Sequence, residues 1–240
     1  AQCLVGSEMC IRDKLCTLLV LQAMGISAFG LNCTSADLCP DIISEIAPYA
    51  KIPLIVKPSA VYEQDGERLS ISPEEFAFAV KKSVLSGAEI AGGCCGTGKE
   101  HIAALREMFA SLDASEINPV EKQDTSLALA TENQMFFLDP ETTEFSPAVE
   151  CGPYMEDDIA QMCGESYDVL TVSINSPDDA IDFGRNMHMA TLPVAFLSDD
   201  EISLKMALML YQGRAIIDRK SLIEPEKLEA MAEKYGAVLY

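Results

Sequence analysis

The sequence predicts an α/β protein built on parallel strands, and its repeating pattern is the main reason. Between residues 14 and 112, short apolar segments typical of buried strands alternate with helical patterns of roughly 10–15 residues. The strands recur about every 30 residues, a spacing typical of a (β/α)8 TIM barrel. Only three such repeats are present. We therefore expect part of a barrel, followed by a second, smaller βα unit.

Residues that start or stop helices and strands support each element of the first part. Gly25 suits the end of a helix and Pro58 the end of a strand. Ser72 is expected to be an N-cap, with Glu75 at the capping-box position. The expected elements, in order, are a helix at 14–25, a strand at 27–33, a helix at 41–50, a strand at 52–58, a helix at 72–87, a strand at 88–95 and a helix at 99–112.

The alternation breaks between residues 113 and 165 and resumes at 166–240. The break contains a predicted hairpin around Glu132–Asn133 and a turn-rich acidic stretch. We divide the chain into a barrel segment at 14–112, a linker and hairpin region at 113–165, and a second unit at 166–240. In the second unit we expect strands at 168–174, 192–199, 213–218 and 237–240, separated by helices at 177–190, 200–212 and 224–236.

Composition excludes some classes of function. A formal net charge of −21 is unsuited to a nucleic-acid binder, which needs basic faces against phosphate. The longest apolar stretch is interrupted by Gly25 and is shorter than a membrane-spanning helix requires. Nine cysteines without a recognisable secretion signal indicate a reducing compartment. We expect a cytoplasmic protein with no nucleic-acid or membrane partner.

The first 13 residues do not fit the pattern that follows. The stretch CLVGSEMCIRD, residues 3–13, has no apolar period or cap that leads into the next helix. It resembles the conceptual translation of a transposase-type sequencing adaptor. We expect native sequence to start near Lys14, and we exclude Cys3 and Cys10 from functional reasoning.

The stretch GAEIAGGCCGTGKEHI, residues 87–102, has two incompatible interpretations. Gly93, four further residues and Gly98-Lys99 fit most of a phosphate-binding loop. However, Glu100 stands where that loop has a Ser or Thr for Mg²⁺, and its carboxylate would repel a triphosphate. The alternative is a metal site at the adjacent thiols of Cys94 and Cys95.

A third thiol favours the metal site. Cys33 ends one predicted strand, while Cys94 and Cys95 end another, and chemistry in parallel barrels occurs at these ends. The glycines around the pair allow the turn that both side chains need to face one ion. Three thiolates on Zn²⁺ leave an open fourth position, which is typical of a catalytic zinc and suits a thiol substrate.

Three motifs carry a resemblance to a known family. GLNC after one strand, PLIVKPSA on the next and GGCCGTGKEHI after a third resemble the homocysteine S-methyltransferase domain of cobalamin-dependent methionine synthase and betaine–homocysteine methyltransferase. The resemblance covers residues 15–112. It departs where Ser59-Ala60-Val61 replaces Asn-Ala-Gly and where Lys99-Glu100 replaces the Pro before His101. The resemblance implies that residues 14–112 are the C-terminal half of the homocysteine-binding barrel, and we expect the chain to be truncated before it.

The resemblance implies a function and a mechanism. Cys33, Cys94 and Cys95 would be the zinc ligands, and the homocysteine sulfur would take the fourth position and attack a methyl group to form methionine. The methyl donor implied is methylcobalamin or methyl-folate, through a corrinoid protein or domain, or a sulfonium or betaine compound. Asn32, beside Cys33, suits orientation of the substrate or of that ligand.

The second unit resembles, more weakly, part of the pterin-binding barrel that follows the homocysteine domain in methionine synthase. The shared features are a strand that ends in Ser-Asp, then YQGRAIID and KYGAV. The family's folate-binding Asp and Asn are not recoverable, so we assign no folate site.

Two other functions remain open at this point. One is a non-catalytic zinc-binding or scaffold module, and the other is thiol redox chemistry at Cys94-Cys95. Among the other polar and sulfur-containing residues, we expect packing or structural roles for Cys16, Cys39, Cys151, Cys163 and His188, and a packing or capping role for His101.

Overall fold

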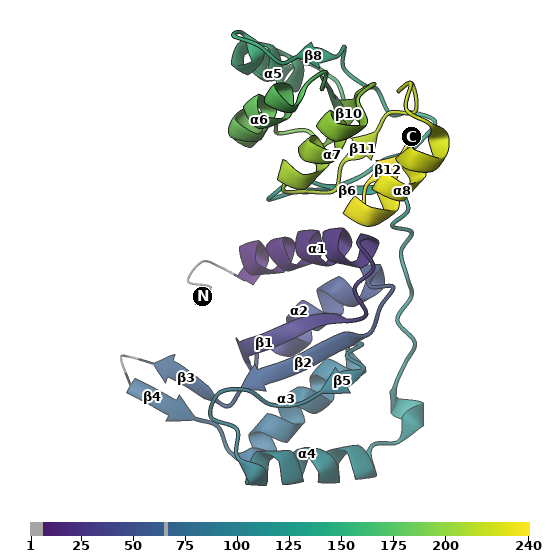
Figure 1. Cartoon of the computed structure of the whole chain (residues 1–240). Helices are drawn as coiled ribbons and strands as arrows, with labels where there is room; N and C mark the ends of the chain where they lie inside the picture. Colours follow the sequence, from purple (N-terminus) through teal and green to yellow (C-terminus); the bar gives the residue numbers. More distant parts are fainter. Residues whose placement is uncertain (1–6, 65–66) are drawn as a thin grey trace. The chain divides into compact units, whose positions relative to one another are not determined.

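The computed structural model describes residues 7–64 and 67–240 and shows a mixed α/β protein (Figure 1). Its internal contacts form two compact units. We call Ile26–Gln123 the cysteine unit, and residues 7–25 with Asp124–Tyr240 the five-stranded unit. Among the helices of the described residues, none has the length and apolar character needed to cross a membrane.

The cysteine unit is built on a small parallel sheet. Its strands are β1 (Phe29–Ser35), β2 (Leu54–Ser59) and β5 (Ile90–Ala91), in the order β1-β2-β5. Both neighbouring pairs are parallel, as the alternating pattern predicts. The carboxyl ends of all three strands therefore lie at the same edge of the sheet.

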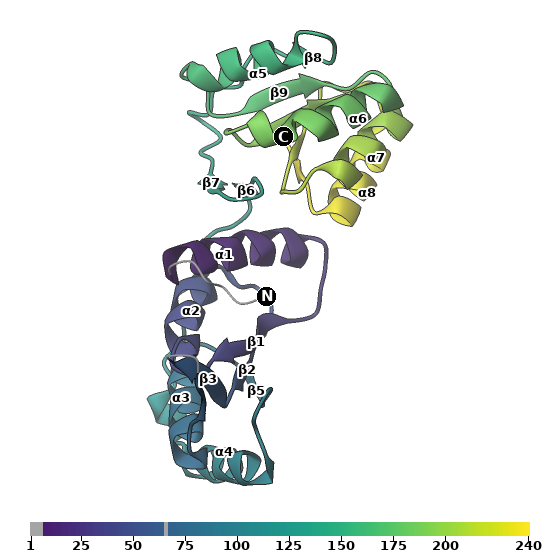
Figure 2. The same ribbon diagram turned by 90° about the vertical axis from the view of Figure 1, so that its left-hand side faces the viewer.

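Helices α2 (Cys39–Ile46) and α3 (Pro73–Leu85) cover one face of this sheet (Figure 2). Helix α2 contacts β1 and β2, and α3 contacts β2 and β5. The short 3₁₀ helix Ala47–Tyr49 follows α2, and α4 (Lys99–Ser111) packs on α3. The core between sheet and helices includes the fully buried side chains of Ile43, Ile46, Val56, Phe76 and Val80.

Two hydrogen bonds confirm the predicted start of α3. The Ser72 hydroxyl accepts a hydrogen bond from the Glu75 backbone N–H at 3.2 Å, and the Ser72 N–H donates to the Glu75 carboxylate at 2.9 Å. These hydrogen bonds to Ser72 hold the pKa of Glu75 below its ordinary value. The capping box satisfies donors that the first turn of a helix leaves unpaired.

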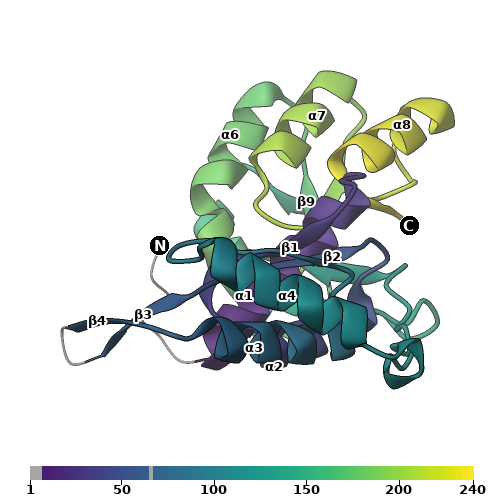
Figure 3. The ribbon, with the colours of Figure 1, turned by 90° about the horizontal axis from the view of Figure 1, so that it is seen from below.

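Two features of the cysteine unit differ from the sequence prediction. Strand β2 runs through Pro58 to Ser59, because Pro58 lies opposite a register shift in β1, where a missing N–H costs no ladder bond. An antiparallel hairpin of β3 (Val61–Gln64) and β4 (Glu67–Ser70) follows, and it extends away from the sheet (Figure 3). The pattern of residues did not predict this hairpin.

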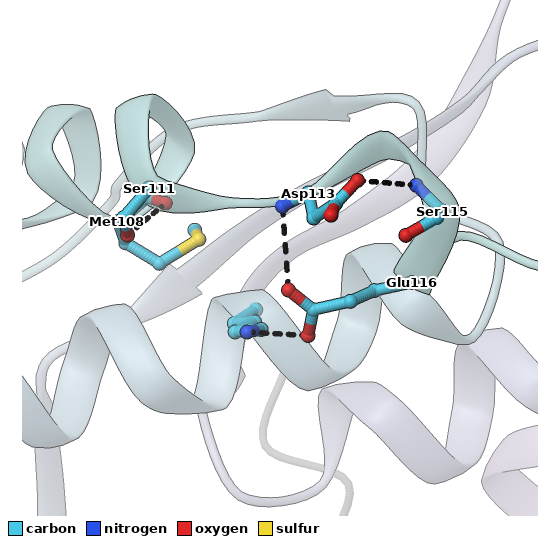
Figure 4. A network of polar contacts seen from close by, with 6 residues as sticks. Met108, Ser111, Asp113, Ser115 and Glu116 are labelled. Carbon is cyan, nitrogen blue, oxygen red and sulfur yellow. Dashed lines mark hydrogen bonds and ion pairs between the residues drawn. The ribbon is translucent and has the colours of Figure 1, made fainter.

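The chain after α4 is tied back to α3 by polar contacts (Figure 4). At the start of the 3₁₀ helix Ala114–Glu116, the carboxylate of the N-cap residue Asp113 accepts a hydrogen bond from the Ser115 N–H at 2.9 Å. The Asp113 N–H donates to Glu116, whose carboxylate also accepts from Lys81 of α3 at 2.8 Å. This network holds the segment that follows α4 against α3.

The five-stranded unit contains a parallel sheet in sequential order, β12-β11-β10-β9-β8. The predicted strands of this unit are present, and one short strand in the expected linker joins them. The strands are β8 (Val149–Glu150), β9 (Leu170–Ser173), β10 (Val194–Leu197), β11 (Ile216–Ile217) and β12 (Val238–Leu239).

Helices and a hairpin bury both faces of that sheet. One face packs against the following helices: α5 (Met155–Gly164), α6 (Pro177–Asn186, continued by the 3₁₀ helix Met187–Met189), α7 (Glu201–Leu210) and α8 (Pro225–Tyr235). The other face packs on the predicted hairpin, β6 (Ala128–Ala130) with β7 (Met135–Phe137). Helix α1 (Ser7–Ala23) contacts this hairpin. It begins at Ser7, within the adaptor-like stretch and seven residues before the expected helix at 14–25; residues 1–6 lie outside the described residues.

Candidate metal centre

The three cysteines singled out in the sequence come together at the carboxyl edge of the β1-β2-β5 sheet. Cys33 lies near the end of β1, and Cys94 and Cys95 follow β5. Their sulfur atoms all lie within 4.8 Å of one another. This is the one group of three or more potential metal ligands of the Cys, His, Asp and Glu types among the described residues.

Two of the three sulfur–sulfur distances suit a shared ion. The Cys95 sulfur is 3.5 Å from that of Cys33 and 3.9 Å from that of Cys94. Thiolates bound to one tetrahedral zinc at about 2.3 Å lie about 3.8 Å apart. The sulfurs of Cys33 and Cys94 are in direct contact, as in a disulfide, with their Cα atoms 5.6 Å apart. Only reduction of this pair makes all three thiols available as ligands.

An unusual backbone conformation directs the Cys33 side chain. Cys33 has φ of 57°, in the left-handed region, and it is the one such non-glycine residue among those described. It lies where the β1–β2 register shifts between Asn32 and Ser35, so β1 contains an extra residue there. Bulges of this kind redirect side chains near functional sites. The conformation costs roughly 1–2 kcal/mol and is held by the surrounding sheet.

The loop of the double cysteine depends on glycine. Gly96 has φ of 76°, and a Cβ added there would lie 2.4 Å from a methyl carbon of Val61. The turn is closed by Thr97, whose N–H and hydroxyl both donate to the Cys94 carbonyl. This turn is the departure from regular strand geometry that two adjacent cysteines need in order to face one point.

Backbone hydrogen bonds fasten that loop to the end of β2. The Cys94 N–H donates to the Pro58 carbonyl at 3.0 Å, and the Ala60 N–H donates to the Cys95 carbonyl at 2.8 Å. The Ser59 hydroxyl, which is buried, also donates to the Cys95 carbonyl at 3.2 Å. Strand β2 therefore holds the double-cysteine loop beside the end of β1, although β2 supplies no cysteine itself.

Asn32 lies directly beside the cluster. Its side-chain N–H donates to the Cys33 sulfur at 3.7 Å. Such a donor stabilises negative charge on the sulfur and orients it. The contact agrees with a role in orienting the Cys33 sulfur. Asn32 is exposed, so its amide is also accessible to a small molecule.

His101 serves as a cap for α4. The Gly98 N–H donates to its Nδ1 at 3.2 Å, so Nε2 carries the proton and donates to the Ile71 carbonyl at 3.2 Å. Its ring also meets Phe76 edge to face at 5.5 Å between centroids. Both ring nitrogens are thereby occupied by the protein, which confirms the expected packing and capping role.

We predict that His101→Ala lowers the free energy of unfolding by about 1–2 kcal/mol, because the cap and one hydrogen bond to Ile71 are lost. The zinc content of the reduced protein should not change. Urea unfolding and zinc analysis of the same preparations test this. A loss of zinc with unchanged stability would instead assign His101 to the site.

The remaining described cysteines lie apart from the cluster. Cys16 is buried in α1, and burial raises the pKa of its thiol to about 11. Burial likewise raises the pKa of Cys151 to about 12. Cys39 donates to the Ser35 carbonyl, and Cys163 packs against the core of the five-stranded unit. Cys3 and the side chain of Cys10 lie outside the described residues.

A cavity of about 330 Å³ opens beside the carboxyl ends of β1 and β2. Ser35 and Ser59, the last residues of these strands, form part of its wall, and Asp37 and Glu75 contribute carboxylates. Both carboxylates accept hydrogen bonds from the protein, Asp37 from Ser35 and Glu75 from Ser72. This cavity was not predictable from the sequence, because segments far apart in the chain form it.

Comparison with known proteins relates the cysteine-bearing segment to one family. Residues 13–109 match the model of the homocysteine S-methyltransferase family. A methionine synthase of Mycobacterium leprae (strain TN) is 30% identical over 100 residues, which are 40% of this chain and 8% of that protein. A selenocysteine methyltransferase of Astragalus bisulcatus is 27% identical over 92 residues, 36% of this chain and 27% of that protein.

A homocysteine S-methyltransferase of Bacillus subtilis (strain 168) is 30% identical over 91 residues. That match covers 36% of this chain and 29% of the relative. The chain thus spans less than a third of the length of each of these three relatives. These three matches span 91–100 residues, close to the 97 residues that match the family model.

Proposed function

We propose that this chain supplies the zinc-binding part of an enzyme that transfers a methyl group to the thiol of homocysteine and so forms methionine. The observation that carries the proposal is the convergence of the Cys33, Cys94 and Cys95 sulfurs within 4.8 Å, in a segment that matches the homocysteine S-methyltransferase family. The names of the relatives, methionine synthase and homocysteine S-methyltransferase, agree with it.

In this proposal the three cysteines have one task, which is to hold Zn²⁺ as thiolates and leave a position for the substrate sulfur. Bound there, zinc would lower the pKa of the substrate thiol and keep it a thiolate at neutral pH. Asn32, through its N–H on the Cys33 sulfur, orients one ligand. The hydrogen bonds from the end of β2 keep the double cysteine in place.

The proposed transfer is a direct displacement. The homocysteine thiol loses its proton, its sulfur forms a bond to the methyl carbon, and the bond between that carbon and the donor breaks with its electron pair left on the donor. Alignment of sulfur, methyl and leaving group is what the protein provides. As donor we propose a methylated corrinoid, carried by a partner protein or domain and recharged from methyl-folate; a sulfonium or betaine compound is the alternative.

We also propose the architecture that this function needs. Strands β1, β2 and β5 would be part of a (β/α)8 TIM barrel of the homocysteine-binding type, in the predicted segment 14–112, with 113–165 as linker and 166–240 as a diverged part of a pterin-binding barrel. The parallel order of the strands and the ligands at their carboxyl ends support it. A reducing cytoplasm would keep the three thiols available.

The test begins with wild-type protein purified under reducing conditions. We expect metal analysis to find about one zinc per chain. We also expect a labelled methyl group to be transferred from a methylated corrinoid to homocysteine. Addition of a chelator should abolish the transfer, and zinc should restore it. Well-folded, reduced protein without zinc would contradict the proposal.

A second candidate is a module without methyl transfer, and the direct contact of the Cys33 and Cys94 sulfurs favours one form of it, a thiol-disulfide pair. This differs from the Cys94-Cys95 pair expected from the sequence. Zinc without transfer from any of the methyl donors would support a zinc-binding scaffold. Reversible oxidation of Cys33 and Cys94 in protein that never binds zinc would support redox chemistry.

A further inference from the structure

One positive charge lies on the side of the sheet that faces away from α2 and α3. Lys57 of β2 is paired in parallel register with Asn32 of β1, next to Cys33. Both side chains are exposed, whereas the preceding residues Leu31 and Val56 are buried on the helix side. Because side chains alternate along a strand, Lys57 and Asn32 share the open face of the sheet.

The Lys57 side chain also reaches across to the segment that leads to the double cysteine. A Cβ added to Gly92 would meet the Cγ of Lys57 at 3.4 Å, so the lysine stem passes over this glycine. Gly92 is held to β2 by its N–H, which donates to the Val56 carbonyl, and it precedes Cys94 by two residues. Lys57 thus lies between the two segments that supply the cysteines.

The ammonium of Lys57 is available to a ligand. Lys57 forms no ion pair, hydrogen bond or cation–π contact with any residue whose side chain the structure describes. The chain carries 38 acidic residues but only 17 Lys and Arg. A surplus of basic residues therefore does not explain a lysine without a described partner beside the thiols. An exposed ammonium on a flexible stem binds a carboxylate well.

We propose that Lys57 binds the α-carboxylate of the thiol substrate and so selects an amino acid rather than a simple thiol. The inference rests on the proposed function and adds a specificity-determining residue to it. A substrate sulfur beside Cys33 and Cys94 has its carboxylate four bonds away. The paired residues Asn32 and Lys57 lie one residue before Cys33 along their strands, a rise of about 3.3 Å. Four bonds from the substrate sulfur to its carboxylate cover this distance.

A competing role for Lys57 is to offset the negative charge of three thiolates. That role predicts weaker metal binding without the lysine and the same effect on every thiol ligand. Carboxylate binding predicts normal metal binding and an effect confined to thiols that carry the carboxylate. The two roles therefore separate in an experiment that varies both the protein and the ligand.

The experiment uses the full reduced chain loaded with Co²⁺, whose sulfur-to-cobalt absorption reports each thiol that binds the metal. Homocysteine is compared with 3-aminopropane-1-thiol, which has the same chain and amine but no carboxylate. Lys57→Met removes the charge and keeps the stem, and Lys57→Arg keeps the charge. Lys82→Met is the matched control, because Lys82 is an exposed lysine on α3 that lies over Phe78.

We expect wild-type protein and Lys82→Met to bind homocysteine about 10- to 100-fold more tightly than the aminothiol, the factor expected for one charged hydrogen bond. Lys57→Met should lose this preference through weaker homocysteine binding alone, and Lys57→Arg should keep most of it. Cobalt and zinc stoichiometry should be equal in all four proteins.

If Lys57→Met binds both thiols more weakly by the same factor, or contains less metal, the role of Lys57 is overturned and the proposed function stands. A preference for homocysteine that survives in Lys57→Met would do the same. If wild-type protein binds cobalt but neither thiol reaches the metal, the proposed function itself fails, and the inference fails with it.

Discussion

Replacement of Cys95 by Ser should reduce the bound zinc from about one to less than about 0.1 per chain, and methyl transfer to homocysteine should fall below detection. Ser is a far weaker ligand for zinc than a thiolate, and two remaining thiolates do not hold the ion against competing chelators. The side chain of Cys95 is exposed, so the substitution leaves the core intact. Metal analysis of purified, reduced protein is the measurement.

Cys163→Ser is the matched control for this substitution. Cys163 is a partly buried cysteine of the five-stranded unit, and it takes no part in the cluster of Cys33, Cys94 and Cys95. The Cys163→Ser protein should bind as much zinc as wild type and unfold at a similar urea concentration. Unchanged zinc in Cys95→Ser, with folding confirmed by circular dichroism, would exclude the three-thiol site. Equal loss in both variants would point to a general effect of cysteine removal.

That Cys94 and Cys95 lie in one cluster was predictable from the sequence because their signal is local, whereas Cys33 was singled out by the strand end that it occupies. Cys94 and Cys95 are adjacent, and glycines surround them. The conformation of Cys33 was not predictable, because its left-handed backbone arises at a bulge in the β1–β2 pairing and no glycine marks it. Lys57 was missed for a related reason. Its place beside Asn32 depends on the register of two strands, which the pattern of apolar residues does not specify to the residue.

The same division applies to the fold. The α3 capping box and the parallel pairing followed from residue types at fixed spacing. Three strands were missed: β8, and the strands β3 and β4 that form a hairpin outside the main sheets. Equally short strands, β5, β11 and β12, were predicted because each lies in an apolar segment of the strand–helix alternation, whereas β3, β4 and β8 lie outside it. Pro58 was wrongly predicted to end its strand. A proline is tolerated within β2 because the neighbouring strand β1 has a bulge opposite it, which the sequence does not show.

Gly30→Ala should destabilise the cysteine unit by about 3 kcal/mol without a change in any cysteine. A Cβ at residue 30 would lie 1.9 Å from the Ile55 carbonyl oxygen and 2.7 Å from the Ile55 nitrogen. These atoms belong to the backbone of β2, so the clash can be relieved only if β1 and β2 move apart. Hydrogen exchange of peptides from β1 and β2, in the full chain, is the local measurement; peptides from β9 and β10 should exchange as in wild type.

Gly152→Ala is the control for this prediction, because a Cβ at residue 152 meets nothing within 4 Å. It should leave exchange and urea unfolding unchanged. Normal protection of β1 and β2 in Gly30→Ala would show that the pairing of these strands tolerates the side chain, which contradicts the close approach of Gly30 to Ile55.

Zinc distinguishes the defect of Gly30→Ala from that of Cys95→Ser. A ligand that binds only the folded state adds stability in proportion to the logarithm of its concentration, about 2.7 kcal/mol at 100 times its dissociation constant. Gly30→Ala retains all three thiols, so excess zinc should restore most of the lost protection in β1 and β2. In Cys95→Ser the same zinc should add almost nothing. If zinc fails to stabilise Gly30→Ala while wild type binds it, the strand pairing and the metal site are not coupled, and the role assigned to β2 in holding the double-cysteine loop is wrong.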